Sequence, residues 1–135
     1  MTLTTRRVMS ALVVLTGAAL AAGADAEKPL PPAEAVKRVG QTVYVEMTVR
    51  KAKDRLDKHG LIYLDSEDDF HSPTNLGVAI TRAAAAKFKE KGVADPAAHL
   101  LGKTIRVRGE VLIFETRPYL PVADPGQVEI VGTRK

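Results

Sequence analysis

The chain has 135 residues, of which 45% are hydrophobic and 27% are charged, and its formal net charge at pH 7 is +4. These values are ordinary for one globular domain, and a mildly basic charge is no evidence by itself for a polyanionic partner. The absence of cysteine excludes disulfides, thiolate nucleophiles, cysteine-ligated zinc and a lipoprotein anchor, and the absence of tryptophan indicates an aliphatic core.

The N-terminal stretch has the pattern of an export signal. Two arginines at 6–7 precede an apolar run at 8–22, and the small residues of Ala24-Asp25-Ala26 form a cleavage site before Glu27. Cleavage before Asp25 is the close alternative. A membrane anchor is the other reading, but a span needs about 20 unbroken apolar residues and this run is shorter.

We therefore expect a signal peptide over residues 1–26, a proline-containing extended linker over 27–32 and one domain over 33–135. Removal of the signal would leave no membrane span. The expected location is outside the cytoplasm, in the periplasm or the extracellular space.

The sequence predicts mainly strands in the first half of the domain. A short helix is expected from Pro32 to Val39, and a strand with a buried valine face from Thr42 to Arg50. The charged stretch Lys51–Gly60 reads as a loop. Two further strands are expected at Leu61–Leu64 and Leu76–Ile80, separated by an acidic, turn-rich segment.

A helix should follow from Ala83 to Lys91, capped by Thr81 and stopped by Gly92, and Asp95-Pro96 should start a second, shorter one. After it, apolar residues alternate from Ile105 to Ile113, so this segment is expected to be one strand. Val107 and Ile113 are expected to be buried, and Gly109 to mark a bend or a close approach of another backbone. The last extended segments are Tyr119–Val122 and Gln127–Val131, with a turn at residues 124–126 between them.

This order is that of the OB-fold, a five-stranded Greek-key barrel whose helix lies between the third and fourth strands. Several short motifs also resemble small OB-fold domains of the nucleic-acid-binding, tRNA-anticodon-binding-like type. They are VGQTV (39–43), LDSEDDF (64–70), AKF (86–88), GKTIRVRG (102–109), RPY (117–119) and DPGQVEI (124–130). The resemblance implies an all-β domain with one helix, preceded here by the short N-terminal helix. OB-folds carry many unrelated binding functions, so it implies a binding module of unspecified ligand.

Enzymatic motifs are absent from the sequence. It contains no nucleophile elbow, Walker loop or zinc-protease motif, and its three histidines are far apart in the chain, so we expect no enzyme, no cofactor and no metal site. The acidic segment Asp65–Asp69 departs from the EF-hand pattern at Phe70 and Leu76. Whether it binds a cation is left open.

Basic residues are the more informative feature. In OB-folds, the loop after the first strand and the loop joining the last two strands flank the binding groove. The candidate groove residues are Arg50, Lys51, Lys53, Arg55, Arg106, Arg108, Arg117 and Tyr119. Tyr63 and Phe114 are further candidate stacking platforms.

Two functions fit these observations. One is an exported module that binds single-stranded nucleic acid or another extended anion, through basic loops and stacking aromatic rings. The other is a protein- or envelope-interaction module without a nucleic-acid role, favoured by export, a modest charge and few aromatic residues. Oligomeric state cannot be derived from the sequence.

Overall fold

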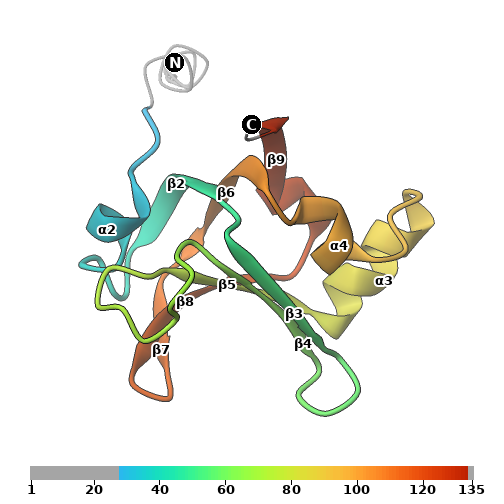
Figure 1. The fold of residues 1–135 in the computed structure, drawn as a ribbon, viewed down its shortest axis with the longest axis horizontal. Helices are drawn as coiled ribbons and strands as arrows, with labels where there is room; N and C mark the ends of the chain where they lie inside the picture. Colours follow the sequence, from blue (N-terminus) through green and yellow to red (C-terminus); the bar gives the residue numbers. More distant parts are fainter. Residues whose placement is uncertain (1–27, 134–135) are drawn as a thin grey trace, which may run out of the picture.

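The computed structural model describes residues 28–133 (Figure 1). The expected signal peptide, and the cleavage sites within it, lie outside these residues. The described elements are α2 (Pro32–Ala35), β2 (Thr42–Thr48), β3 (Lys51–Arg55), β4 (Leu61–Asp65), β5 (Gly77–Thr81), α3 (Arg82–Glu90), α4 (Pro96–Leu100), β6 (Lys103–Glu110), β7 (Leu112–Phe114), β8 (Arg117–Val122), η2 (Pro125–Gln127) and β9 (Val128–Thr133). In this part of the chain, no helix has the length and apolar composition that a membrane crossing requires.

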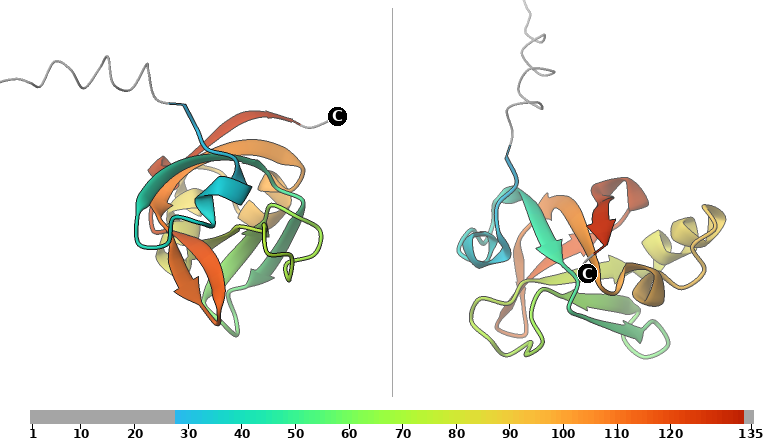
Figure 2. Two further views of the ribbon diagram at one scale, coloured as in Figure 1. Left: turned by 90° about the vertical axis from the view of Figure 1, so that its left-hand side faces the viewer. Right: turned by 45° about the horizontal axis from the view of Figure 1, so that its top comes forward.

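The strands form two sheets. A three-stranded sheet has the order β2-β6-β9, and a five-stranded sheet has the order β3-β4-β5-β8-β7. All pairs are antiparallel except β5 with β8, which run parallel. The β3–β4 and β7–β8 hairpins project from the same side of the molecule (Figures 1 and 2). The edge strands of the five-stranded sheet therefore stand on either side of one face.

The described residues thus form eight strands, and the expectation of five is corrected. One cause is the first expected strand, which changes sheets at its end. The Val49 N–H donates to the Lys103 carbonyl over 2.9 Å in the three-stranded sheet, whereas the Arg50 N–H donates to the Asp65 carbonyl over 2.9 Å in the five-stranded sheet.

The segment after this crossing is strand β3, where the sequence indicated a loop. Its residues are too polar to show apolar alternation, because only Ala52 packs against the core. A lysine-rich edge strand is common in sheets, since charge discourages pairing with a second molecule. Backbone pairing with β4, from Lys51–Asp65 to Arg55–Leu61, defines the strand instead.

The second cause lies in the long C-terminal strand, which breaks at Val111. The N–H of Val111 donates to the Gln41 carbonyl over 3.0 Å, and its own carbonyl accepts from the Gly40 N–H over 2.7 Å. Beyond it β7 pairs with β8 in the other sheet, so the alternation changes phase. Val107 and Val111 are fully buried, but Ile113 is 53% exposed, and its expected burial was wrong.

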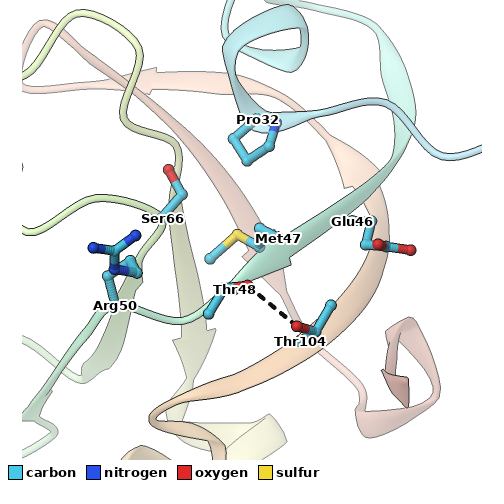
Figure 3. A pocket seen from close by; sticks show the side chains of 7 residues that line it. All are labelled: Pro32, Glu46, Met47, Thr48, Arg50, Ser66 and Thr104. Atoms are coloured by element: carbon cyan, nitrogen blue, oxygen red, sulfur yellow. Dashed lines mark hydrogen bonds between the residues drawn. The ribbon is translucent and has the colours of Figure 1, made fainter. Parts of the chain in front are cut away.

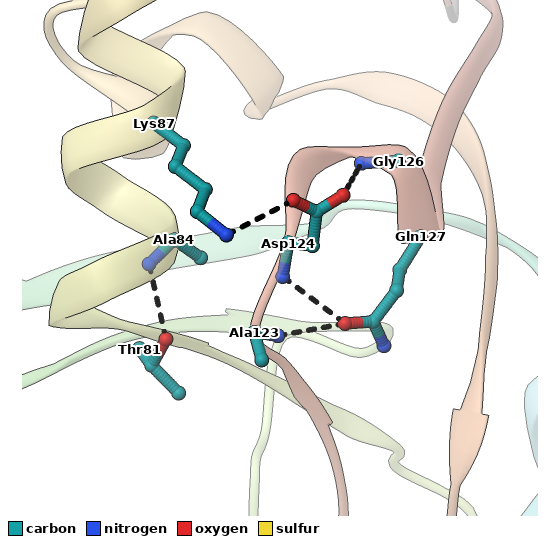
Figure 4. A network of polar contacts seen from close by, with 7 residues as sticks. All are labelled: Thr81, Ala84, Lys87, Ala123, Asp124, Gly126 and Gln127. Atoms are coloured by element: carbon teal, nitrogen blue, oxygen red, sulfur yellow. Dashed lines mark hydrogen bonds and ion pairs between the residues drawn. The ribbon is translucent and has the colours of Figure 1, made fainter.

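The core between the sheets is aliphatic, as the composition indicates, and Phe88 of α3 is its only buried aromatic ring in the described chain. Thr81 caps α3 by accepting from the Ala84 N–H over 3.1 Å, as expected. Figure 4 shows how this helix is tied to the η2 turn: Lys87 forms an ion pair with Asp124 at 3.3 Å. Asp124 and Gln127 form a capping box, so the turn itself is rigidly defined.

Candidate functional site

The five-stranded sheet presents one face to solvent. In β4, Ile62 and Leu64 point into the core, so the intervening Leu61, Tyr63 and Asp65 lie on the opposite face. We call this side the outer face. Cross-strand partners share a face, so the strand register gives the other residues of the outer face. They are Lys51, Lys53 and Arg55 of β3, Gly77, Ala79 and Thr81 of β5, Arg117, Tyr119 and Pro121 of β8, and Leu112 and Phe114 of β7.

Four of these residues are cationic. Lys51, Lys53 and Arg55 occupy every second position of β3, and Arg117 comes from β8. In the described part of the chain, none of the four forms an ion pair within 4.0 Å. Two of them instead stack on Phe70 from the β4–β5 loop: the Lys53 Nζ lies 4.5 Å from the ring centroid, and the Arg117 Cζ lies 4.6 Å from it. Their charges remain available to a ligand.

Aromatic rings form a row across the same face. Tyr63 and Tyr119 meet edge to face with centroids 5.6 Å apart, and Phe114 meets Tyr119 in the same way at 5.9 Å. His59, from the β3–β4 turn, continues the row at 6.1 Å from Tyr63. Burial raises the pKa of both tyrosine hydroxyls above the ordinary value.

A glycine positions Tyr119. A Cβ at Gly77 would lie 2.4 Å from the Tyr119 Cε2, so the ring rests directly on the Gly77 backbone. This close approach is possible only without a side chain at position 77. Gly77 and Tyr119 are direct partners in the parallel β5–β8 pair, which brings them together.

Two cavities flank Tyr63. One, of about 200 Å³, is lined by Lys53, Arg55, His59, Tyr63, Asp65, Phe70 and Glu115. The other, of about 190 Å³, is almost entirely apolar and is lined by Leu61, Tyr63, Ala79, Leu112, Ile113, Phe114, Tyr119 and Pro121. A charged cavity and an apolar cavity therefore share one aromatic wall.

Asp65 lies in the charged cavity with only 3% of its surface exposed. Its Oδ1 accepts a hydrogen bond of 3.1 Å from the Asn75 Nδ2. Burial raises the pKa of Asp65, while the Asn75 hydrogen bond and the positive charges of β3 and β8 partly oppose the rise.

The structure brings together five of the eight candidate groove residues: Lys51, Lys53, Arg55, Arg117 and Tyr119 all lie on the outer face. The expected platforms Tyr63 and Phe114 lie there too. Arg50 lies apart, at a polar pocket of about 340 Å³ beside the end of β2 (Figure 3), and pairs with Asp68 at 3.4 Å.

Arg106 and Arg108 lie elsewhere, in β6 of the three-stranded sheet. The Arg106 Nε donates to the Glu46 Oε1 over 2.9 Å, and the Arg108 guanidinium stacks on Tyr44 at 4.4 Å from the ring centroid. The structure does not bring these two arginines to the other candidates.

Three residues of the site were missed in the sequence: Phe70, Gly77 and Asp65. Phe70 stands in a loop, and only its position within an otherwise polar segment distinguished it. Gly77 follows the turn-rich segment, where glycine is common, so its role beside Tyr119 had no distinct sequence signal. Asp65 continued the alternation of β4 onto the outer face, which was a usable signal.

The acidic segment does not converge on a metal site. Among the described residues, no group of three or more His, Asp or Glu side chains is placed to hold a cation. Asp68 pairs with Arg50, and the Asp69 carboxylate accepts from the His71 N–H over 2.9 Å. This hydrogen bond lowers the pKa of Asp69.

No protein-family model and no curated protein matches the sequence. Several solved structures, in contrast, are similar to the chain. An aspartyl tRNA synthetase from Entamoeba histolytica aligns with a TM-score of 0.52 and 13% identity over 80% of this chain and 22% of its own. A Leishmania major protein described as an aspartyl-tRNA synthetase aligns with a TM-score of 0.53 and 11% identity. The alignment covers 80% of this chain and 21% of the synthetase.

The engineered protein OBody AM3L09, solved bound to hen egg-white lysozyme, aligns with a TM-score of 0.54 and 16% identity, over 79% of this chain and 97% of its own. The chain spans about a fifth of the length of the two synthetases. At such identities the similarity is one of fold alone. It supports the OB-fold that the sequence motifs indicated.

Proposed function

We propose that the outer face of the five-stranded sheet binds single-stranded nucleic acid, or another extended polyanion, and that the chain is a binding module rather than an enzyme. The observation that carries the proposal is the set of cations without carboxylate partners beside a row of aromatic rings. On the pattern of residues 1–26 we further propose that the module acts after export.

The arrangement suits a charged, flexible chain. Cations at alternate positions of β3 repeat about every 7 Å along the strand, as an array that can follow a phosphate backbone. The aromatic row beside them offers stacking to bases, which is insensitive to sequence because every base has a π face. Two of the structurally similar proteins are named as tRNA synthetases, which is consistent with this use of the fold.

The test is a salt titration of a labelled single-stranded oligonucleotide against the parent protein and three variants. Each lost phosphate contact should lower the slope of log affinity against log salt by about 0.7 on a single strand. Lys53→Ala and Arg117→Ala should each show this change. Arg106→Ala is the matched control, because that arginine is already paired with Glu46 on the other sheet.

An equal slope change for Arg106→Ala would mean that the oligonucleotide is attracted to basic surface in general. No binding by the parent at low salt would overturn the proposal altogether.

Exposed apolar side chains in β7 favour the second candidate function, which is protein interaction. Leu112, Ile113 and Phe114 are 42%, 53% and 45% exposed, so β7 presents a run of apolar side chains. Clusters of this kind often mark protein contacts. OBody AM3L09 is an instance of the fold solved with a protein bound. If the parent protein does not bind oligonucleotides, protein interaction becomes the favoured function.

A further inference from the structure

Asp65 lines the charged cavity and has one carboxylate oxygen without a hydrogen-bond donor among the described residues. Its Oδ1 accepts from Asn75, but within the described residues its Oδ2 accepts no hydrogen bond. Only 3% of the surface of this residue is exposed. A buried carboxylate oxygen without a donor is costly, and such an atom usually has a partner.

The cavity that Asp65 lines is larger than one ordered water. Its volume is about 200 Å³, whereas one water molecule takes up about 30 Å³ in the liquid. Its lining also includes two aromatic rings, those of Tyr63 and Phe70. A planar group that carries N–H donors on its edge fits both features.

A metal cation fits the cavity poorly. Lys51, Lys53 and Arg117 lie close enough to act electrostatically on the Asp65 carboxylate. These positive charges would repel a metal ion, whereas a neutral N–H donor meets no such repulsion. They also favour the ionised carboxylate, which accepts hydrogen bonds without donating any.

We propose that Asp65 selects the base of a bound single strand, by accepting hydrogen bonds from N–H groups on its Watson–Crick edge. Guanine is the best match, because its N1–H and N2–H₂ are adjacent donors that a carboxylate accepts together. Thymine and uracil are the worst, because their single N3–H lies between two carbonyl oxygens that repel the carboxylate. This inference rests on the proposed nucleic-acid binding and adds specificity to it.

The test compares three labelled 12-mers at low salt by fluorescence anisotropy. The first is all thymidine, the second has one central deoxyguanosine, and the third has deoxyinosine there, which lacks only the N2 amino group. The guanine strand should bind the parent protein about tenfold more tightly than the thymidine strand. The inosine strand should fall between them.

Two variants assign the effect to the carboxylate. Asp65→Asn keeps the shape but replaces one acceptor oxygen with a donor, so the guanine preference should disappear while the thymidine strand binds as well or better. Asp68→Asn is the control, since Asp68 belongs to the same acidic segment but is exposed and paired with Arg50. It should retain the preference, and thermal melts verify that both variants are folded.

The outcomes separate the two proposals. No binding of the thymidine or the guanine strand at low salt overturns both. Equal binding of the two strands overturns base selection and leaves the polyanion site intact. A preference that survives Asp65→Asn overturns the role of Asp65. If that variant does not fold, equal affinities of the parent for the guanine and inosine strands still overturn it.

Discussion

The outer face of the five-stranded sheet and the Tyr44–Arg108 side of the three-stranded sheet carry the same residue types, but these residues make different contacts. On the three-stranded sheet, Arg106 is paired with Glu46 at 2.9 Å and Arg108 covers Tyr44. On the five-stranded sheet, Lys53 and Arg117 both stack on Phe70 without a carboxylate partner in the described chain. The contrast lies in the ion pair: Glu46 neutralises the Arg106 charge on one sheet, whereas Lys53 and Arg117 on the other have no carboxylate of the described residues within ion-pair distance.

This difference shows why the number of cations says little about a binding site. Exposed ion pairs contribute at most about 1 kcal/mol to stability, but they neutralise the charge that a polyanion would need. An arginine over an aromatic ring keeps its full charge and is held in place. Both sheets hold a cation in this second way, but on the five-stranded sheet two cations share the Phe70 ring and lie on the same face as Tyr63, Tyr119 and Phe114.

The largest expected effect comes from two glycines, one in each sheet. A Cβ at Gly109 of β6 would lie 2.6 Å from the Leu120 Cδ2, and Leu120 is fully buried. Gly109→Val should therefore overpack the core and cost about 3 kcal/mol of unfolding free energy. Gly77→Val would displace only the partly exposed Tyr119 ring, so it should cost about 1 kcal/mol but weaken oligonucleotide binding.

Urea denaturation and oligonucleotide titration of both variants measure this contrast. Equal stabilities of the two variants would contradict it, and so would unchanged binding by Gly77→Val.

A smaller effect is expected from one tyrosine on each face. Tyr119→Ala should weaken oligonucleotide binding by about 2 kcal/mol, because it removes a stacking surface. The salt dependence should not change, since stacking releases no counterions. Tyr44→Ala, on the three-stranded sheet, should leave affinity as it is. Anisotropy titrations at two salt concentrations measure both quantities, and a loss of affinity in Tyr44→Ala would mean that the faces are not distinct.

Local patterns in the sequence predicted those elements that local chemistry determines. Thr81 and Asp95 cap the helices that they were expected to cap, and apolar alternation located β2. Strand β3 and the break at Val111 were not predicted, because both depend on which sheet supplies the hydrogen-bond partner. In β3 only Ala52 packs against the core, so the strand has no apolar period of its own.

The candidate site could be predicted only in part for the same reason. Basic residues near the ends of the first and last strands were identifiable, and five of the eight candidates share the outer face. The pairing of Arg106 with Glu46 joins residues 60 positions apart. Which cations are neutralised therefore depended on sheet register, which the chain does not display locally.

The smallest expected effect concerns Asp65, the only buried carboxylate in the described residues. Burial raises its pKa in the folded protein above the unfolded value, so the folded state holds this proton more tightly. Its stabilising contribution is complete below the unfolded pKa and is lost as pH rises through the folded pKa. Asp65→Asn carries no such proton, so the variant should gain stability relative to the parent as pH rises from 3 to 7.

Urea denaturation of the two proteins over this pH range measures the difference directly. Exposed carboxylates with lowered pKa, such as Glu67, Asp69 and Asp124, act in the opposite direction, but they are present in both proteins and cancel. A stability difference that does not vary with pH would contradict the buried, ionised carboxylate. A rising difference would show that the parent keeps a charge on the outer face at the expense of its own stability, as binding sites commonly do.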